Sequence, residues 1–65
     1  MPEENELDDA LRKLTPKYRT VIHLYYYEGY STGEISKILS IKESTVRTQL
    51  SRARAQLSDL LKGEI

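Results

Sequence analysis

The sequence contains no cysteine, no tryptophan and no phenylalanine, and His23 is its single histidine. Without cysteine, a disulfide, a thiolate metal site and a thiol nucleophile are all excluded. Prolines and glycines are also few, which favours a small helical domain over a disordered segment. The longest apolar run is only a few residues, too short to span a membrane, and the acidic start does not resemble a signal peptide. We therefore expect a cytoplasmic protein.

A catalytic or cofactor site cannot be assembled from these residues. A chain of 65 residues allows one domain, and it lacks a glycine-rich loop that would cradle phosphate. His23 has no nucleophile or paired carboxylate at a defined spacing, so we interpret it as a surface residue. We expect no enzymatic activity, no metal, no cofactor and no small-molecule substrate.

The net charge of zero hides an uneven distribution of charge along the chain. Residues 1–10 carry five acids and no base, whereas residues 42–56 carry four bases and one acid. We interpret residues 1–6 as an acidic N-terminal tail before a domain at 7–63. The pattern permits a locally basic surface on a neutral body, so binding of a polyanion by this chain alone is expected to be weak.

Apolar residues recur at helical spacing in four stretches, and no stretch alternates as a strand does. These stretches are Leu7, Ala10, Leu11 and Leu14; Tyr18, Val21, Ile22 and Tyr25; Ile35, Ile38 and Leu39; and Val46, Leu50, Ala53, Leu57, Leu60 and Leu61. We therefore predict an all-α fold with four helices, the last of them the longest. The second helix is so apolar that we expect Tyr25 and Tyr26 in the core or at its edge, with Tyr27 exposed.

The breaks between these stretches carry helix start and stop signals. Thr15 is a good N-cap, and Pro16 after it is tolerated at the first helical position. Gly29 and Gly63 can adopt the left-handed conformation that often follows a helix. These residues place the ends of the second and fourth helices.

The third and fourth helices are predicted to form a helix-turn-helix over about residues 31–55. Ser31 and Glu34 have the spacing of a capping box, which begins the third helix. The break at residues 40–42 is short, and two helices joined in this way hold the second one ready to enter the major groove of DNA. The last helix would therefore be a recognition helix.

The outer face of the last helix has the composition expected of a DNA-reading surface. Opposite its apolar stripe lie four small residues: Ser44, Thr48, Ser51 and Ala55. Arginines border this ridge, Arg47 and Arg54 on one side and Arg52 on the other. Small polar residues allow close approach to base edges, while guanidinium groups contact bases or phosphates.

Several segments together resemble the C-terminal domain, region 4, of bacterial sigma factors of the extracytoplasmic-function type. The resemblance covers about residues 7–61 and rests on Leu14-Thr15-Pro16-Lys17-Tyr18-Arg19, Tyr26-Tyr27-Glu28-Gly29-Tyr30-Ser31, Glu34-Ile35-Ser36, Ile38-Leu39, Thr45-Val46-Arg47 and Ser51-Arg52-Ala53-Arg54. The response-regulator helix-turn-helix family shares some of these motifs but usually lacks the tyrosine pair and the Arg-Ala-Arg segment.

The resemblance implies that the last helix recognises the minus-thirty-five element of promoter DNA during transcription initiation. By position, it assigns base reading to Arg47, Thr48, Ser51 and Arg52. It assigns phosphate contacts to Thr32, Lys42, Thr45 and Arg54. It also implies that the first two helices face the flap of RNA polymerase, and that an anti-sigma factor is a further partner.

Two residues depart from the family's usual pattern, and two other functions remain open. Ser40 stands where glycine is common and would need a strained conformation or an adjusted turn, while Lys42 stands where a serine cap is common, each at a cost of about 1 kcal/mol. The alternatives are a response-regulator-type DNA-binding domain and a helical module that binds the polymerase flap or an anti-sigma factor without DNA.

Overall fold

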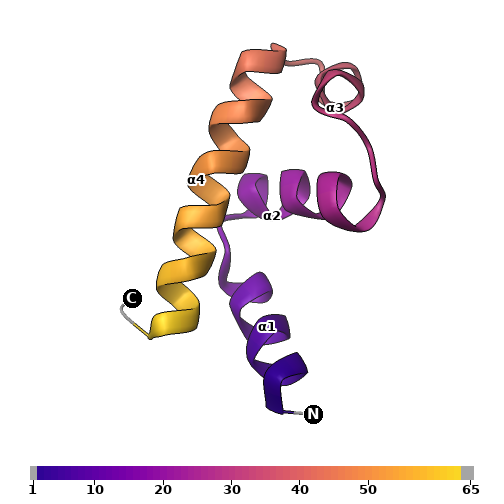
Figure 1. Ribbon diagram of the computed structural model, residues 1–65. Helices are drawn as coiled ribbons and strands as arrows, with labels where there is room; N and C mark the ends of the chain where they lie inside the picture. The colour runs from indigo at the N-terminus through magenta and orange to yellow at the C-terminus, as the bar shows by residue number, and fades with distance from the viewer. Residues whose placement is uncertain (1, 64–65) are drawn as a thin grey trace.

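The computed structural model describes residues 2–63 of the chain, and the side chains of residues 6–63. The described part consists of α1 (Pro2–Lys13), α2 (Pro16–Ile22), a π-helical turn η1 (His23–Tyr27), α3 (Thr32–Leu39) and α4 (Glu43–Lys62) (Figure 1). All of its regular structure is helical, which confirms the predicted all-α class and the four helices. No helix in this part of the chain is long and apolar enough to cross a membrane.

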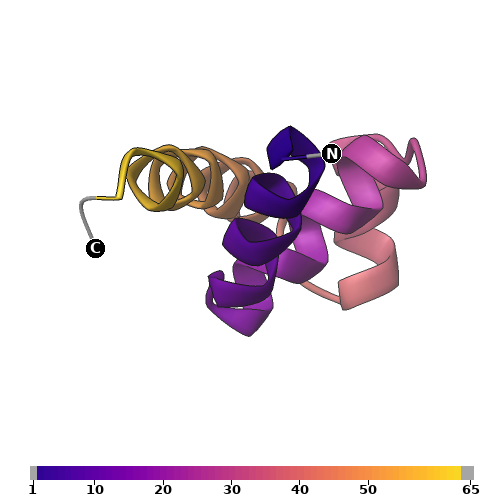
Figure 2. The same cartoon turned by 90° about the horizontal axis from the view of Figure 1, so that it is seen from below.

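Helix α4 is the element against which the others pack. Helix α1 lies beside its C-terminal half, α2 crosses near its middle, and α3 lies beside its N-terminal end (Figure 1). Seen from below, the last turns of α4 extend away from the other helices (Figure 2). The first turns of α4 lie at the other end of the molecule, beside α3 (Figure 1).

The core contains only small and branched apolar side chains, because the helices approach α4 closely. It consists of Leu14, Val21, Ile22, Ile35, Val46, Leu50 and Ala53, and Ala10 on α1 is also buried. The apolar stripes predicted these residues. Four members of the stripes are instead exposed: Leu7 at 38%, Tyr25 at 37%, Ile38 at 50% and Leu61 at 47%. Leu61 belongs to the last turn of α4, the end of the helix that extends away from the other elements (Figure 2).

The start of α1 and the capping of α2 differ from their predictions. Helix α1 begins at Pro2, so most of residues 1–6, interpreted as a tail, is helical, while Met1 lies outside the described residues. Thr15 is at the N-cap of α2 as predicted, but its side chain does not cap that helix. Instead, the Thr15 N–H donates to Gln56 Oε1 at 3.0 Å and Gln56 Nε2 donates to Thr15 Oγ1 at 3.3 Å. The connection between α1 and α2 is thereby fixed to α4.

The end of α2 continues into a widened turn that the sequence did not predict. In η1 the Glu28 N–H donates to the His23 carbonyl at 3.0 Å, a π-type spacing. Gly29 follows with φ of 79°, which confirms its predicted left-handed conformation. A π-turn takes more residues than an α-turn, so the side chains after Ile22 no longer follow the α-helical stripe. Tyr26 is 53% exposed and Tyr25 37% exposed as a result, so the predicted place of both tyrosines in the core or at its edge is wrong.

Candidate nucleic-acid interface

The outer ridge of α4 faces solvent along its whole length. Val46, Leu50 and Ala53 are buried on the opposite side of the helix. The predicted ridge and its bordering arginines are all exposed: Ser44, Thr48, Ser51, Ala55, Arg47, Arg52 and Arg54. This confirms which face of α4 is buried, and it leaves the four predicted base-reading residues together on adjacent exposed turns.

The start of α3 is fixed by the predicted capping box. The Glu34 N–H donates to Ser31 Oγ at 3.1 Å, and the Ser31 N–H donates to Glu34 Oε1 at 2.8 Å. A hydrogen bond donated to the carboxylate favours its ionised form, so the Ser31 backbone N–H, and after it the Ser31 side chain, lowers the pKa of Glu34. The first helix of the helix-turn-helix thus begins at a defined residue, and Ile35 one turn later is completely buried.

The turn between α3 and α4 is held without glycine. Ser40 adopts the left-handed conformation with φ of 58° and ψ of 45°, which is the first of the two outcomes expected for it and a conformation unfavourable for a residue with a Cβ atom. Ser36 secures the turn twice: its Oγ donates to the Ile41 carbonyl, and its carbonyl accepts the Ile41 N–H at 3.1 Å. Lys42 is the N-cap of α4 and makes no side-chain cap, as predicted. The position of α4 therefore depends on Ser36 and on the strained Ser40.

A carboxylate that sequence reasoning missed joins two of the predicted DNA contacts. Thr32 Oγ1 donates to Glu43 Oε2 at 2.6 Å, and Arg47 Nη1 lies 3.1 Å from the same oxygen. Thr32 is the first residue of α3, and Glu43 and Arg47 lie one turn apart on α4. The sequence held a signal for the ion pair, because an acid four residues before an arginine on one helix is a favoured pairing.

The remaining predicted contacts differ in their surroundings. Arg52 is exposed, and among residues 6–63 no ion pair holds its guanidinium. Lys42 is exposed beside the turn, while Thr45 is half-buried in the first turn of α4. Arg54 points away from the ridge, because its Nη1 donates to the Tyr26 hydroxyl at 2.6 Å. Its guanidinium carbon also lies 5.9 Å from the centre of the Tyr26 ring.

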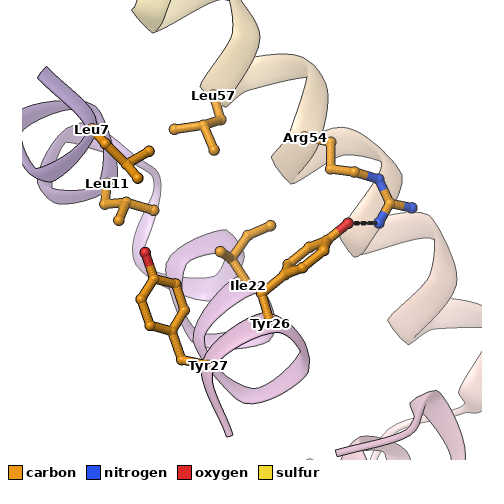
Figure 3. Close-up of a pocket in the computed structure, with 7 residues that line it drawn as sticks. All are labelled: Leu7, Leu11, Ile22, Tyr26, Tyr27, Arg54 and Leu57. Atoms are coloured by element: carbon orange, nitrogen blue, oxygen red, sulfur yellow. Dashed lines mark hydrogen bonds between the residues drawn. The ribbon is translucent and has the colours of Figure 1, made fainter. Parts of the chain in front are cut away.

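An apolar groove lies between α1, η1 and α4, away from the outer ridge. Its volume is about 290 Å³, and its lining comes from these three elements and from the last residue of α2: Leu7, Leu11, Ile22, Tyr26, Tyr27, Arg54 and Leu57 (Figure 3). Tyr27 stands on the α1 side and Tyr26 on the α4 side, where its hydroxyl meets Arg54. Tyr27 is exposed, as predicted. The groove was missed because it depends on the π-turn, which directs both tyrosines away from the core.

His23 is exposed, as predicted. Its Nε2 lies 3.1 Å from Glu28 Oε2, and its ring stacks on Tyr27 at a centroid distance of 5.5 Å. The imidazole of His23 is therefore a surface group of η1 that contacts Glu28 and Tyr27.

Residues 4–57 match the protein family described as Sigma-70, region 4. The chain is similar to the ECF RNA polymerase sigma factor SigW of Bacillus subtilis, with 41% identity over 58 residues, which are 89% of this chain and 31% of that protein. It is also 41% identical to the ECF RNA polymerase sigma factor SigE of Mycolicibacterium smegmatis, over 86% of this chain and 22% of that protein.

A third relative, the ECF RNA polymerase sigma factor SigL of Mycobacterium tuberculosis, is 45% identical over 65% of this chain and 24% of that protein. The chain thus spans less than a third of the length of each of these three relatives. No solved structure matches the chain.

Proposed function

Because this chain belongs to the Sigma-70, region 4 family, we propose that it is the part of a longer sigma factor that binds the minus-thirty-five element of promoter DNA. The observation that carries the proposal is the exposed ridge of small residues on α4, bordered by arginines and presented by the short turn after α3. Such a ridge fits the major groove, whose width admits one α-helix. The family match favours this function over a response-regulator-type domain.

Base reading is assigned to Arg47, Thr48, Ser51 and Arg52. Arginine can donate two hydrogen bonds to a guanine edge, and the hydroxyls of serine and threonine can bond to several bases. All four side chains are exposed on α4, and among residues 6–63 the Arg52 guanidinium takes part in no ion pair. Such contacts specify sequence, whereas phosphate contacts set the depth and register of the helix.

Phosphate contacts are assigned to Thr32, Lys42, Thr45 and Arg54, which flank the ridge. The Thr32 hydroxyl has one hydrogen, which it gives to Glu43, so its contact with a phosphate would come from its backbone N–H at the start of α3. Arg54 uses only one of its five donors on Tyr26, which leaves others for a phosphate.

The groove between α1, η1 and α4 is proposed to face protein partners, namely the flap of RNA polymerase and an anti-sigma factor. Exposed Leu7, Tyr26 and Tyr27 supply apolar and aromatic surface there, which is typical of protein interfaces. This division leaves the outer ridge of α4 to DNA and the groove on its other side to protein, in the cytoplasm and without a catalytic step. Tethering to the polymerase would raise the local concentration of a domain whose net charge is zero.

The proposal is tested by selecting a preferred duplex from a pool of random double-stranded DNA and comparing it with a scrambled duplex in a fluorescence anisotropy titration. Arg52→Ala is expected to reduce the preference by about 1–3 kcal/mol, because it removes a base contact. Lys42→Ala is the matched control: it should weaken both duplexes equally and reduce the slope of log affinity against log salt by about 1.

A chain that prefers no duplex at any salt concentration would overturn DNA reading by α4. Binding of a flap peptide by such a chain would then favour the interaction module instead. Equal weakening of both duplexes by Arg52→Ala would show that Arg52 contacts a phosphate, and the assignment of that residue would be wrong.

A further inference from the structure

Glu43 is the acid at the centre of the helix-turn-helix, and its contacts are unlike those of an ordinary surface residue. One of its oxygens receives Thr32 Oγ1 at 2.6 Å and lies 3.1 Å from Arg47 Nη1. A Cβ atom placed on Gly33 would lie 3.8 Å from that oxygen, so the carboxylate packs against the first turn of α3. The Glu43 carboxylate therefore contacts α3 at Thr32 and α4 at Arg47, two of the proposed DNA contacts.

The ion pair is too exposed to be explained by stability. The Arg47 and Glu43 side chains are 60% and 46% exposed, and pairs of this kind contribute little to folding. The ion pair instead limits the orientation of Arg47, because a guanidinium that bonds a fixed carboxylate loses much of its rotational freedom. The carboxylate is itself fixed by Thr32, which belongs to a different helix. Arg47 is thus oriented by the body of the domain and not only by its own helix.

The same carboxylate also affects the charge of the reading surface. Residues 42–56 contain four bases, and Glu43 is their single acid. The Glu43 carboxylate next to Arg47 disfavours a phosphate at that guanidinium, since the carboxylate and the phosphate are both anionic. A base edge presents neutral acceptors, so the penalty at a base is smaller. Glu43 therefore acts against binding that ignores sequence.

We infer that Glu43 is a positioning residue for base recognition: it orients Arg47 toward the bases and opposes the use of Arg47 as a phosphate contact. The inference rests on the proposed function, because it requires Arg47 to meet a base. It predicts that loss of Glu43 lowers sequence preference while raising affinity for unrelated DNA, a combination that loss of folding would not produce.

The test measures the affinity of wild type, Glu43→Ala and Glu43→Gln for the selected and scrambled duplexes. Glu43→Ala is expected to bind the scrambled duplex more tightly and to reduce the ratio of the two affinities by about two- to fivefold, the factor an exposed ion pair supplies. Glu43→Gln loses the charge but keeps an oxygen that accepts hydrogen bonds, so it should retain more of the ratio. The control for net charge is Glu6→Ala, which removes an exposed acid from α1; that helix lies at the opposite end of the molecule from α3 (Figure 1).

A double-mutant cycle with Arg47→Ala shows whether Glu43 acts through Arg47. The effect of Glu43→Ala on the affinity ratio should disappear when Arg47 is already alanine. The inference is overturned if Glu43→Ala leaves the ratio unchanged, or changes it equally with and without Arg47. If the wild type itself has no preference, the proposed function fails together with the inference, whereas a wild type with a preference that Glu43→Ala preserves rejects the inference alone.

Thermal unfolding of each variant separates positioning from folding. If Glu43→Ala unfolds near the assay temperature, Glu43→Gln replaces it in the affinity measurements, because the amide preserves the size of the side chain. A side-chain NMR signal from Arg47 Nε adds a direct measure of orientation. It is expected to exchange faster with water in Glu43→Ala than in wild type, and unchanged exchange would contradict the orienting role.

Discussion

Arg54 on α4 donates a hydrogen bond to the Tyr26 hydroxyl over 2.6 Å, and its guanidinium lies beside the tyrosine ring. The two residues are 28 positions apart in the sequence, so this contact joins η1 to α4 directly. Tyr26 also lines the apolar groove, as does Arg54 (Figure 3). A residue on the border of the proposed DNA surface is thereby anchored by a residue of the proposed protein surface.

Removing only the Tyr26 hydroxyl should weaken this connection. In Tyr26→Phe the ring is retained and one hydrogen bond to a charged group is lost, so the free energy of unfolding is expected to fall by about 0.5–1 kcal/mol, the low end for a site this exposed. Denaturation with urea, followed by circular dichroism, measures the change. Tyr25→Phe removes the neighbouring hydroxyl, which the structure does not pair with Arg54, and should have a smaller effect. Equal effects of the two variants would contradict an anchoring role for Tyr26.

Features that depend on neighbouring residues were predicted from the sequence. The capping box of Ser31 and Glu34, the left-handed Ser40 and the terminal Gly63 all follow from local backbone chemistry, and the structure contains each of them. The buried stripe of α4 was predicted for a related reason, since the periodicity of a long helix is regular. Sequence was therefore sufficient to find the helix-turn-helix and the exposed face of its last helix.

Features that depend on distant residues were missed. The spacing of Tyr26 fits an α-helical stripe, and only the π-turn after Ile22 directs it toward Arg54. Thr15 has the chemistry of a cap, but Gln56 competes for its hydroxyl from another helix. Glu43 could be paired with Arg47 from their spacing, but its bond to Thr32 requires knowing how α3 meets α4. The contacts missed in these three cases, Tyr26 with Arg54, Thr15 with Gln56 and Glu43 with Thr32, each join residues of different elements.

Ser40 offers a test of the strain in the turn. Its φ of 58° is costly for a residue with a Cβ atom and costs glycine little. Ser40→Gly is therefore expected to stabilise the domain by about 0.5–1 kcal/mol, the relief of strain exceeding the added entropy of the unfolded chain.

The control for Ser40→Gly is the same substitution at Ser58, an exposed residue inside α4. Glycine within a helix is unfavourable, so Ser58→Gly should destabilise the domain by about 0.5 kcal/mol. The two variants differ only in the backbone conformation at the substituted site, and the changes should have opposite signs in thermal unfolding. If Ser40→Gly destabilises the domain as Ser58→Gly does, the turn does not store the strain that its φ implies.

The capping box makes part of the stability dependent on pH. The bonds from Ser31 lower the pKa of Glu34 in the folded state below its ordinary value of 4.5. A group whose pKa is lower in the folded state stabilises the fold above its unfolded pKa, and this contribution is lost as the pH falls through the folded value. The start of α3 should therefore weaken under acid conditions below about pH 4.5.

Glu34→Gln isolates that contribution because glutamine can still accept the bond from the Ser31 N–H but does not titrate. At neutral pH the wild type should be more stable than Glu34→Gln, and the difference in melting temperature should shrink as the solution is acidified. Glu6→Gln, measured over the same range, accounts for the loss of one negative charge elsewhere on the surface. A difference between wild type and Glu34→Gln that stays constant down to about pH 3 would mean that the ionised Glu34 carboxylate does not support the start of α3.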